Sequence, residues 1–254
     1  MTIKSIFWRF LTVVSGFILA AGCAKISSPT GGPKDKEPPV ILKSVPLNGS
    51  TNFKGNRIVI TFNEYVALDN INEKFMVSPP MENKPVILVR GKNIVIEYDE
   101  ELRDSTTYTF YFQDAVRDLN EGNPISNYQF VFSTGPVIDS LSVTGNIFKA
   151  TDLNPPEATL AMLYIEHEDS AFSKLLPSYI AMADKNGYFR IDNVSAREYR
   201  LYALKDADNS KNFNLADEEI AFLDSTIRVT PEKNWLPVVA DSLMPKPKDP
   251  KAAD

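Results

Sequence analysis

Short segments in which large apolar residues occupy every second position constrain the fold of this chain more than any other feature. In residues 106–112 (TTYTFYF) the even positions hold Tyr108, Phe110 and Phe112, while the odd positions hold two threonines and a tyrosine. Successive side chains of an extended strand point to opposite faces. This segment therefore predicts a strand with one aromatic row in a core. Residues 128–133 (YQFVFS) repeat the pattern, so we expect the two strands to pair.

Segments of this kind, rich in β-branched and aromatic residues and bounded by turn residues, recur from about residue 38 to residue 229. Further strands are expected at residues 57–62, 85–89, 93–98 and 199–204. The dipeptide Asn186-Gly187, a strong tight-turn signal, precedes a segment that places Phe189 and Ile191 on one face. No long helical period accompanies these strands. The pattern therefore predicts an all-β fold of two tandem antiparallel β-sandwiches.

The N-terminal residues are typical of a lipoprotein signal. Lys4 and Arg9 give a basic start, residues 10–21 form an apolar run of 12 residues, and Ala-Ala-Gly precedes Cys23 as a small-residue cleavage site. An apolar run of this length is too short to span a bilayer, which needs about 20 residues. The motif resembles the bacterial lipobox, which implies that Cys23 carries diacylglycerol and that lipid, rather than a helix, anchors the protein.

The alternative is an ordinary secretory signal that happens to precede a structural thiol. Cys23 is the only cysteine of the chain, and an exported thiol without a disulfide partner has no structural reason. We therefore expect lipidation. Residues 24–37 (AKISSPTGGPKDKE) lack apolar periodicity, and we expect a flexible tether that reaches at most roughly 45 Å.

The charge balance bears on partners and location. Removal of residues 1–22 would leave 25 basic and 33 acidic residues, a net charge of −8. The basic residues are scattered, whereas nucleic-acid binding depends on clustered Lys and Arg facing phosphates, so we expect no nucleic-acid partner. In one group of Gram-negative bacteria an acidic run after the lipidated cysteine marks surface export. None follows Cys23, which favours an outer-membrane anchor facing the periplasm.

The first β-rich region contains the opening EPPVILKSVPLNGSTNF, then RIVITFNEYV, then a Thr-Tyr-Thr-Phe strand followed by Gly-Asn-Pro and Phe-Ser-Thr-Gly. Together these stretches resemble the bacterial Ig-like domain of the SbsA type. The resemblance implies a seven-stranded sandwich that serves as a spacer or adhesion module in surface-layer and envelope proteins, without common catalytic residues. We place this domain at residues 38–135, after a signal at 1–22 and a tether at 23–37.

The second β-rich region centres on ADKNGYFRIDNVSAREYRLYALKDAD, residues 183–208. Its Asn-Gly turn, Phe-x-Ile strand, Val194 and Tyr-x-Leu-x-Ala strand resemble the prealbumin-like sandwich of carboxypeptidase regulatory modules. Those modules usually have Pro or Gly before the tyrosine, whereas this chain has Ala-Arg-Glu, so we expect a different connecting turn. We place this domain at residues 136–230 and interpret residues 231–254, which contain five prolines, as an extended tail.

Few residues are candidates for catalysis. His167 is the only histidine and no Gly-x-Ser-x-Gly motif is present, which argues against a histidine-rich metal centre and a nucleophilic triad. The remaining candidates are Asp99, Glu100, Glu101 and Asp104, because a glycosidase needs only two carboxylates. Adjacent acids before a strand are usually solvated. We therefore expect a protein that is not an enzyme.

The most informative polar segment is residues 206–219 (DADNSKNFNLADEE). Oxygen-bearing side chains recur at every second position, and acids return about 12 positions after the first, as in a calcium-binding loop. The candidate ligands are Asp206, Asp208, Ser210, Asn212, Asp217 and Glu218. Lys211 stands where such a loop has glycine. Two interpretations remain: a calcium site, or a solvated Asn/Asp-rich connection between strands. No other cofactor is expected.

These features predict a lipid-anchored, non-catalytic envelope protein whose sandwiches act as a structural or protein-interaction module. We expect Cys23 to hold it to the membrane and another envelope protein to be its partner. The alternative is a glycan-binding surface lipoprotein in which exposed aromatic residues stack on sugar rings. Tyr65, Tyr111 and Trp235 are the candidates for that role.

Overall fold

The structure of this protein is a computed structural model that describes residues 32–165 and 168–231. The chain divides into two compact units, Met1–Lys36 and Glu37–Asp254, and every strand and helix described below lies in the second unit. Cys23, His167 and Trp235 lie outside the described residues, as do the predicted signal and most of the tail. Within the described ranges, no helix has the length and apolar composition needed to cross a membrane.

The described chain is all-β, as the sequence predicted. The first sandwich contains β1 (Ile41–Val45), β2 (Arg57–Phe62), β3 (Val66–Leu68), α2 (Ile71–Lys74), β4 (Met76–Ser78), β5 (Val86–Arg90), β6 (Asn93–Glu97), β7 (Thr107–Gln113), β8 (Val116–Asp118) and β9 (Tyr128–Ser133). The second sandwich contains β10 (Leu141–Asn146), β11 (Leu160–Tyr164), α3 (Ala171–Lys174), β12 (Tyr179–Met182), β13 (Tyr188–Val194), β14 (Glu198–Lys205), β15 (Glu219–Phe222) and β16 (Ile227–Arg228). The predicted strands at 57–62 and 128–133 match β2 and β9, and the other predicted strands differ by one residue at one or both ends.

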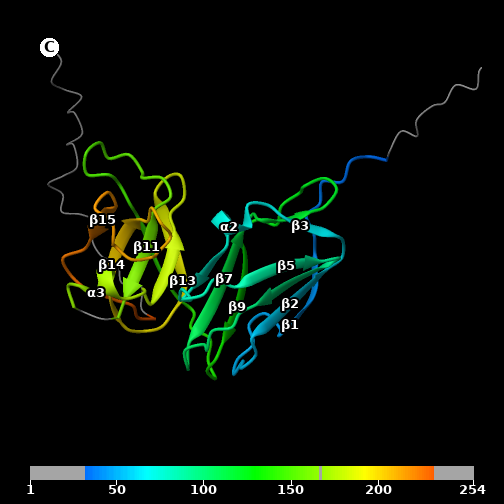
Figure 1. Ribbon diagram of the computed structural model, residues 1–254, viewed down its shortest axis with the longest axis horizontal. Coiled ribbons are helices and arrows are strands. Elements are labelled where there is room, and N and C mark those ends of the chain that lie inside the picture. Colours follow the sequence, from blue (N-terminus) through cyan, green and yellow to red (C-terminus); the bar gives the residue numbers. More distant parts are fainter. Residues whose placement is uncertain (1–31, 166–167, 232–254) are drawn as a thin grey trace, which may run out of the picture. The chain divides into compact units, whose positions relative to one another are not determined.

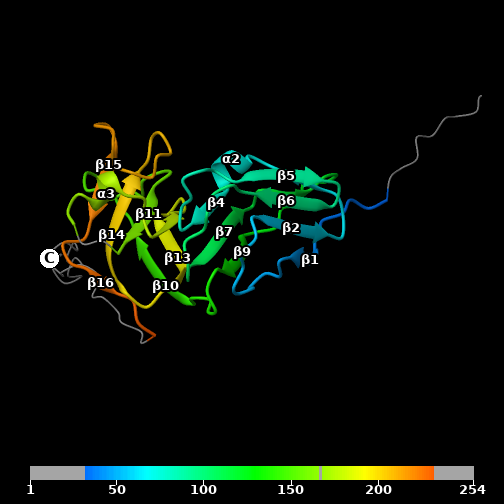
Figure 2. The ribbon, with the colours of Figure 1, turned by 60° about the horizontal axis from the view of Figure 1, so that its bottom comes forward.

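The strands of the first sandwich form two antiparallel sheets and a short ribbon (Figures 1 and 2). One sheet has the order β1-β2-β6-β5, the other β4-β7-β9, and β3 pairs with β8. The predicted pairing of the two aromatic strands is confirmed, because Tyr108 of β7 is opposite Phe132 of β9 and Phe110 is opposite Phe130. The connection between these two strands contains β8, which pairs with β3.

One core lies between the two sheets of the first sandwich. Its fully buried side chains include Ile58, Ile60, Phe62, Ile94, Ile96, Phe110, Phe112, Phe130 and Phe132. The rings meet mainly edge to face, with the Phe110 and Phe132 centroids 5.6 Å apart, a geometry that aromatic pairs favour. The predicted core row of β7 is therefore confirmed.

The opposite face of β7 is buried as well, which the sequence did not predict. Thr107, Thr109 and Tyr111 point to this face, and all three are buried. The second sandwich packs against this face. Asn193 of β13 donates a hydrogen bond from Nδ2 to Oγ1 of Thr109 at 2.8 Å. Both views place β13 beside β7 (Figures 1 and 2).

In the second sandwich, β10 and β13 form one sheet and the other has the order β12-β11-β14-β15, with β16 also paired to β14. Phe189 and Ile191 of β13 are buried between the sheets, as predicted. The predicted turn at 185–187 is present, with Gly187 at φ +77° and its N–H donating to the Asp184 carbonyl at 2.9 Å. It joins β12 to β13, which belong to different sheets, and is therefore not a hairpin turn.

Candidate functional site

The loop of residues 206–218 joins β14 to β15, two paired antiparallel strands. Its aromatic residue Phe213 packs on the outer face of the five-stranded sheet that contains β11 and β14. The backbone N–H of Phe213 donates to the Phe172 carbonyl at 3.0 Å, and the two rings lie 5.8 Å apart. The sheet therefore positions a loop that is otherwise polar.

Three of the six predicted calcium ligands come together in this loop. The carboxylates of Asp206, Asp208 and Glu218 each offer an oxygen, and these atoms lie within 4.8 Å of one another. Asp208 is exposed, Asp206 is half-buried, and Glu218 is only 7% exposed. Asp217 is not part of this group. The third carboxylate of the cluster is that of Glu218, the next residue.

Backbone N–H groups already occupy several of these oxygens. Glu218 accepts hydrogen bonds from the N–H of Ala207, Asn214 and Leu215 at 3.0–3.1 Å. Ser210 N–H donates to both Asp206 and Asp208, at 3.1 and 2.9 Å. The loop is therefore closed by its own backbone through these carboxylates.

The side chains of the two remaining candidate ligands, Ser210 and Asn212, face backbone carbonyl groups instead of the carboxylate cluster. Ser210 Oγ donates to the Asn212 carbonyl at 3.0 Å, and the Asn212 side-chain amide faces the Leu175 carbonyl. Lys211, which stands where calcium loops have glycine, adopts φ +60°. The backbone thus makes the turn that glycine would make, at a cost of about 1–2 kcal/mol for a residue with a side chain.

Burial and hydrogen bonding shift the two aspartates in opposite directions. Burial raises the pKa of Asp206, partly offset by the hydrogen bond from Lys211 N–H. Hydrogen bonds from Ser210 and Asn214 lower the pKa of Asp208 to about 2. Three carboxylates at one point concentrate negative charge that a divalent cation would neutralise. Calcium binding at this loop stays a prediction.

The other sequence candidates are placed apart. Tyr65 is exposed beside Lys92, whose Nζ lies 5.7 Å from the ring centroid, whereas Tyr111 is buried in β7 against the second sandwich. In the acidic run of residues 99–104, Glu100 accepts a hydrogen bond from Asn83 N–H at 3.1 Å. This carboxylate therefore accepts a hydrogen bond from a neighbouring backbone segment.

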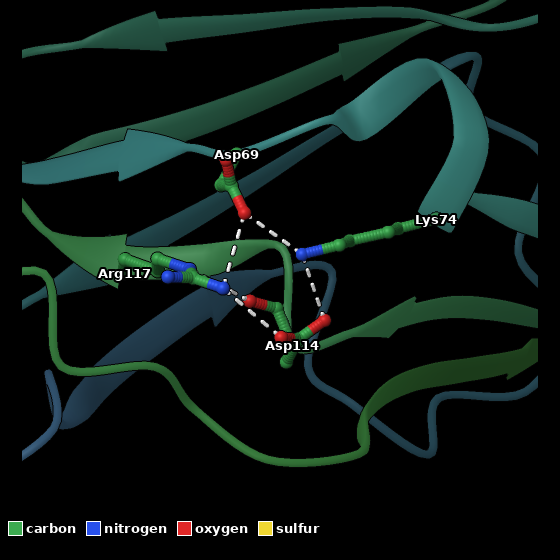
Figure 3. Close-up of polar contacts among 4 residues, drawn as sticks. All are labelled: Asp69, Lys74, Asp114 and Arg117. Atoms are coloured by element: carbon green, nitrogen blue, oxygen red, sulfur yellow. Dashed lines mark hydrogen bonds and ion pairs between the residues drawn. The ribbon is translucent and has the colours of Figure 1, made fainter.

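A four-residue ion network was missed by sequence reasoning (Figure 3). Lys74 Nζ lies 2.8 Å from Asp69 and 3.0 Å from Asp114, and Arg117 Nη2 lies 3.0 Å from each of the same aspartates. The hydrogen bond to Lys74 lowers the pKa of Asp69 and of Asp114. The network ties α2 and the β3–β8 ribbon to the end of β7. The network joins two local pairs, Asp69–Lys74 and Asp114–Arg117, that are distant from each other in sequence, so their association could not be predicted.

The structure also contains a cleft that was not predicted from the sequence. It has a volume of about 610 Å³, and its lining combines β4, β7 and β9 of the first sandwich with β12 and β13 of the second. Three tyrosines, Tyr111, Tyr128 and Tyr188, are part of the lining. The cleft could not be predicted because it exists only where the two sandwiches meet.

Fold and site define an all-β protein of tandem sandwiches, and comparison with known families agrees for the first of them. The family model for the bacterial Ig-like domain matches residues 35–134, close to the predicted 38–135. The first sandwich therefore contains an Ig-like domain. No curated protein matches the chain.

Solved structures that resemble this chain include surface-layer and pilus proteins. A crystal structure of the S-layer protein rSbsC is 13% identical, with a TM-score of 0.25, over 65% of this chain and 23% of that one. The N-terminal part of SbsC is 14% identical, with a TM-score of 0.26, over 74% of this chain and 44% of that one. The major pilin subunit BcpA of Bacillus cereus is 12% identical, with a TM-score of 0.22, over 77% and 67%. This chain thus spans less than half of either S-layer structure.

Proposed function

We propose that this protein is a lipid-anchored, non-catalytic component of the bacterial envelope whose two sandwiches act as a structural or protein-interaction module. The observation that carries the proposal is the match of residues 35–134 to the bacterial Ig-like domain. The lipoprotein signal ending at Cys23 supports the anchor, and the second sandwich is proposed to be a prealbumin-like module.

An apolar row on the first sandwich supports a protein partner. The register aligns Val45, Val59, Val95 and Leu88 across β1, β2, β6 and β5. Since Ile94 and Ile96 point into the core, Val95 and its neighbours point to the outer face of the sheet. Val45 and Leu88 at the ends of the row are exposed, whereas Val95 between them is only 2% exposed, and the ion pair Arg57–Glu97 borders the row. An exposed apolar patch with a polar rim is typical of interaction sites.

Cell fractionation tests the anchor. The wild-type chain should be recovered in the membrane fraction, and its processing should be blocked by globomycin. The Cys23→Ala variant should leave the membrane fraction, since no other anchor is proposed. Retention of that variant in membranes, or processing that is insensitive to globomycin, would refute lipid anchoring.

Protease shaving of intact cells tests the orientation and separates the second candidate function, glycan binding at the cell surface. One observation favours that candidate: the cleft lining includes an exposed aromatic ring, Tyr188, although Tyr111 itself is buried and cannot stack on a sugar as the sequence predicted. Survival of the protein on shaving, with signal in the outer membrane, supports the periplasmic face and a structural role. Loss on shaving places it at the surface and favours glycan or host binding.

A further inference from the structure

The cleft where the two sandwiches meet has walls that are held in place by buried polar contacts. The backbone N–H of Ile180 in β12 donates to Oγ of Ser78 in β4 at 3.0 Å, and this bond is buried. The contact of Asn193 with Thr109 joins β13 to β7 at 2.8 Å. The cleft is therefore a preformed feature, as small-molecule sites usually are.

Two tyrosine hydroxyls in the cleft lining lack hydrogen-bond partners among the described residues. Tyr128 is 9% exposed and Tyr111 is 8% exposed. Within the described chain no group has hydrogen-bond geometry to the buried Tyr111 hydroxyl, although Thr109 and the Asp192 backbone lie next to it. Buried polar groups are nearly always hydrogen-bonded. The Tyr111 hydroxyl, buried on the cleft wall without a partner, therefore indicates a polar ligand.

The charged groups of the lining are already compensated. Asp192 is paired with Arg190 at 2.7 Å, and Asp114 belongs to the network with Lys74 and Arg117. Asp184 accepts hydrogen bonds from the N–H groups of the turn that follows it. A charged ligand would have to break these pairs, so the cleft favours a neutral one.

Neutral amides remain available. The side chains of Gln113, Asn127 and Gln129 line the cleft, and none of them makes a side-chain hydrogen bond within the described ranges. Each amide offers donors and an acceptor together, which suits adjacent hydroxyl groups. Tyr188, which is 40% exposed, adds an accessible ring on the opposite wall.

Main-chain pairing with a peptide is obstructed on two of the bordering strands. The edge of β9 is hydrogen-bonded to residues 48–50, with Gly49 N–H donating to the Val131 carbonyl at 2.7 Å and Val131 N–H donating to Asn48 Oδ1 at 2.8 Å. On β12, Ile180 N–H is taken by Ser78. An extended peptide commonly binds by adding a strand to a sheet edge, and these two edges are already hydrogen-bonded. A ligand of this cleft would therefore be recognised through side chains.

We propose that this cleft binds a neutral oligosaccharide. The hydroxyls of Tyr128 and Tyr111 and the amides of Gln113 and Gln129 hydrogen-bond to sugar hydroxyls, and the Tyr188 ring packs against a sugar face. The site is a property of the two sandwiches and holds whether or not Cys23 carries lipid, so it is tested separately from the anchor.

Calorimetric titration of the purified protein with maltohexaose, cellohexaose and chitohexaose tests the proposal. At least one of the three should bind saturably. Tyr128→Phe, which removes one hydroxyl, should weaken that binding by about two- to tenfold, the value of a single hydrogen bond. The matched control is Tyr98→Phe, whose hydroxyl donates to the Gly55 carbonyl at 2.8 Å away from the cleft, and its affinity should equal wild type.

Folding does not confound this test, because the Tyr128 hydroxyl has no partner to lose and Tyr128→Phe should keep the wild-type melting temperature. Gln129→Ala provides a second variant with the same expected loss of affinity. The absence of saturable binding to all three sugars would overturn the proposal, as would equal affinities for wild type and both cleft variants. Binding of a peptide corresponding to residues 232–254 in the cleft, with no sugar bound, would make it a peptide site instead.

Discussion

The two sandwiches bury their strands in different ways. In the first, the strand β2 alternates between core and outer face, and a single aromatic core lies between two sheets. In the second, β11 is buried at all five positions, because one face of its sheet packs on β10 and β13 while the other is covered by α3, Phe213 and Met76 of the first sandwich. The second sandwich therefore depends on a neighbour and a polar loop to cover its central sheet, and the first does not depend on such a loop.

Truncation of the first core should have the largest effect. Phe110 is fully buried and its ring contacts three aromatic neighbours. Phe110→Ala should lower the free energy of unfolding by about 3–5 kcal/mol, measured by urea denaturation. Because buried contacts join the sandwiches, the whole transition should move. A first sandwich that unfolds alone, with the signal of the second unchanged, would contradict this coupling. Leu42→Ala, on the exposed face of β1, is the control.

The same difference explains what the sequence could reveal. The period-two alternation around Phe110 and Phe130 identified strands, their pairing and their core face. β11 was not predicted, because its residues LAMLY are apolar on both faces and therefore show no alternation. Among the candidate ligands, the carboxylates of Asp206 and Asp208 lie close together, as their spacing suggested, while their role as ligands stays a prediction. Residue spacing could not decide whether the carboxylate of Asp217 or that of Glu218 lies beside Asp206 and Asp208, because this depends on how Phe213 packs the loop against the sheet.

Metal addition distinguishes the two interpretations of the loop that covers the second sandwich. If the loop is a calcium site, calcium at 100 times its dissociation constant should stabilise the protein by about 2.7 kcal/mol, seen as a rise in melting temperature that chelator reverses. Glu218→Gln should abolish the rise, whereas Asp217→Asn, outside the carboxylate cluster, should retain it. Equal effects of calcium and magnesium at matched ionic strength would establish a solvated connection between strands.

The junction should be measurable through one hydroxyl. Ser78→Ala removes the acceptor of the buried Ile180 N–H, which should cost about 1–3 kcal/mol and shift the urea midpoint. Ser50→Ala is the matched control, because the buried Ser50 hydroxyl has no hydrogen-bond partner among the described residues and its loss should cost almost nothing. A Ser78→Ala midpoint equal to wild type would mean that the second sandwich does not rely on this contact.

The smallest effect should be a pH dependence of stability whose sign differs between individual carboxyls. In the first sandwich, the shifted carboxyls Asp69, Asp114 and Asp118 all have a lowered pKa. An unfolded chain then binds more protons than the native one just below pH 3.8, so stability rises with pH there. The loop adds one carboxyl of each kind: the pKa of Asp208 is lowered to about 2, and burial raises the pKa of Asp206.

For Asp206 the native state binds more protons than the unfolded state just above pH 3.8, so its contribution to stability falls as pH rises through that interval. Urea midpoints of wild type and variants across this range should separate the two groups. Asp206→Asn should remove a falling component above pH 3.8, and Asp208→Asn a rising component between pH 2 and 3.8. Difference profiles of the same sign would show that burial does not govern Asp206, and the loop would then resemble the hydrogen-bonded carboxyls of the first sandwich.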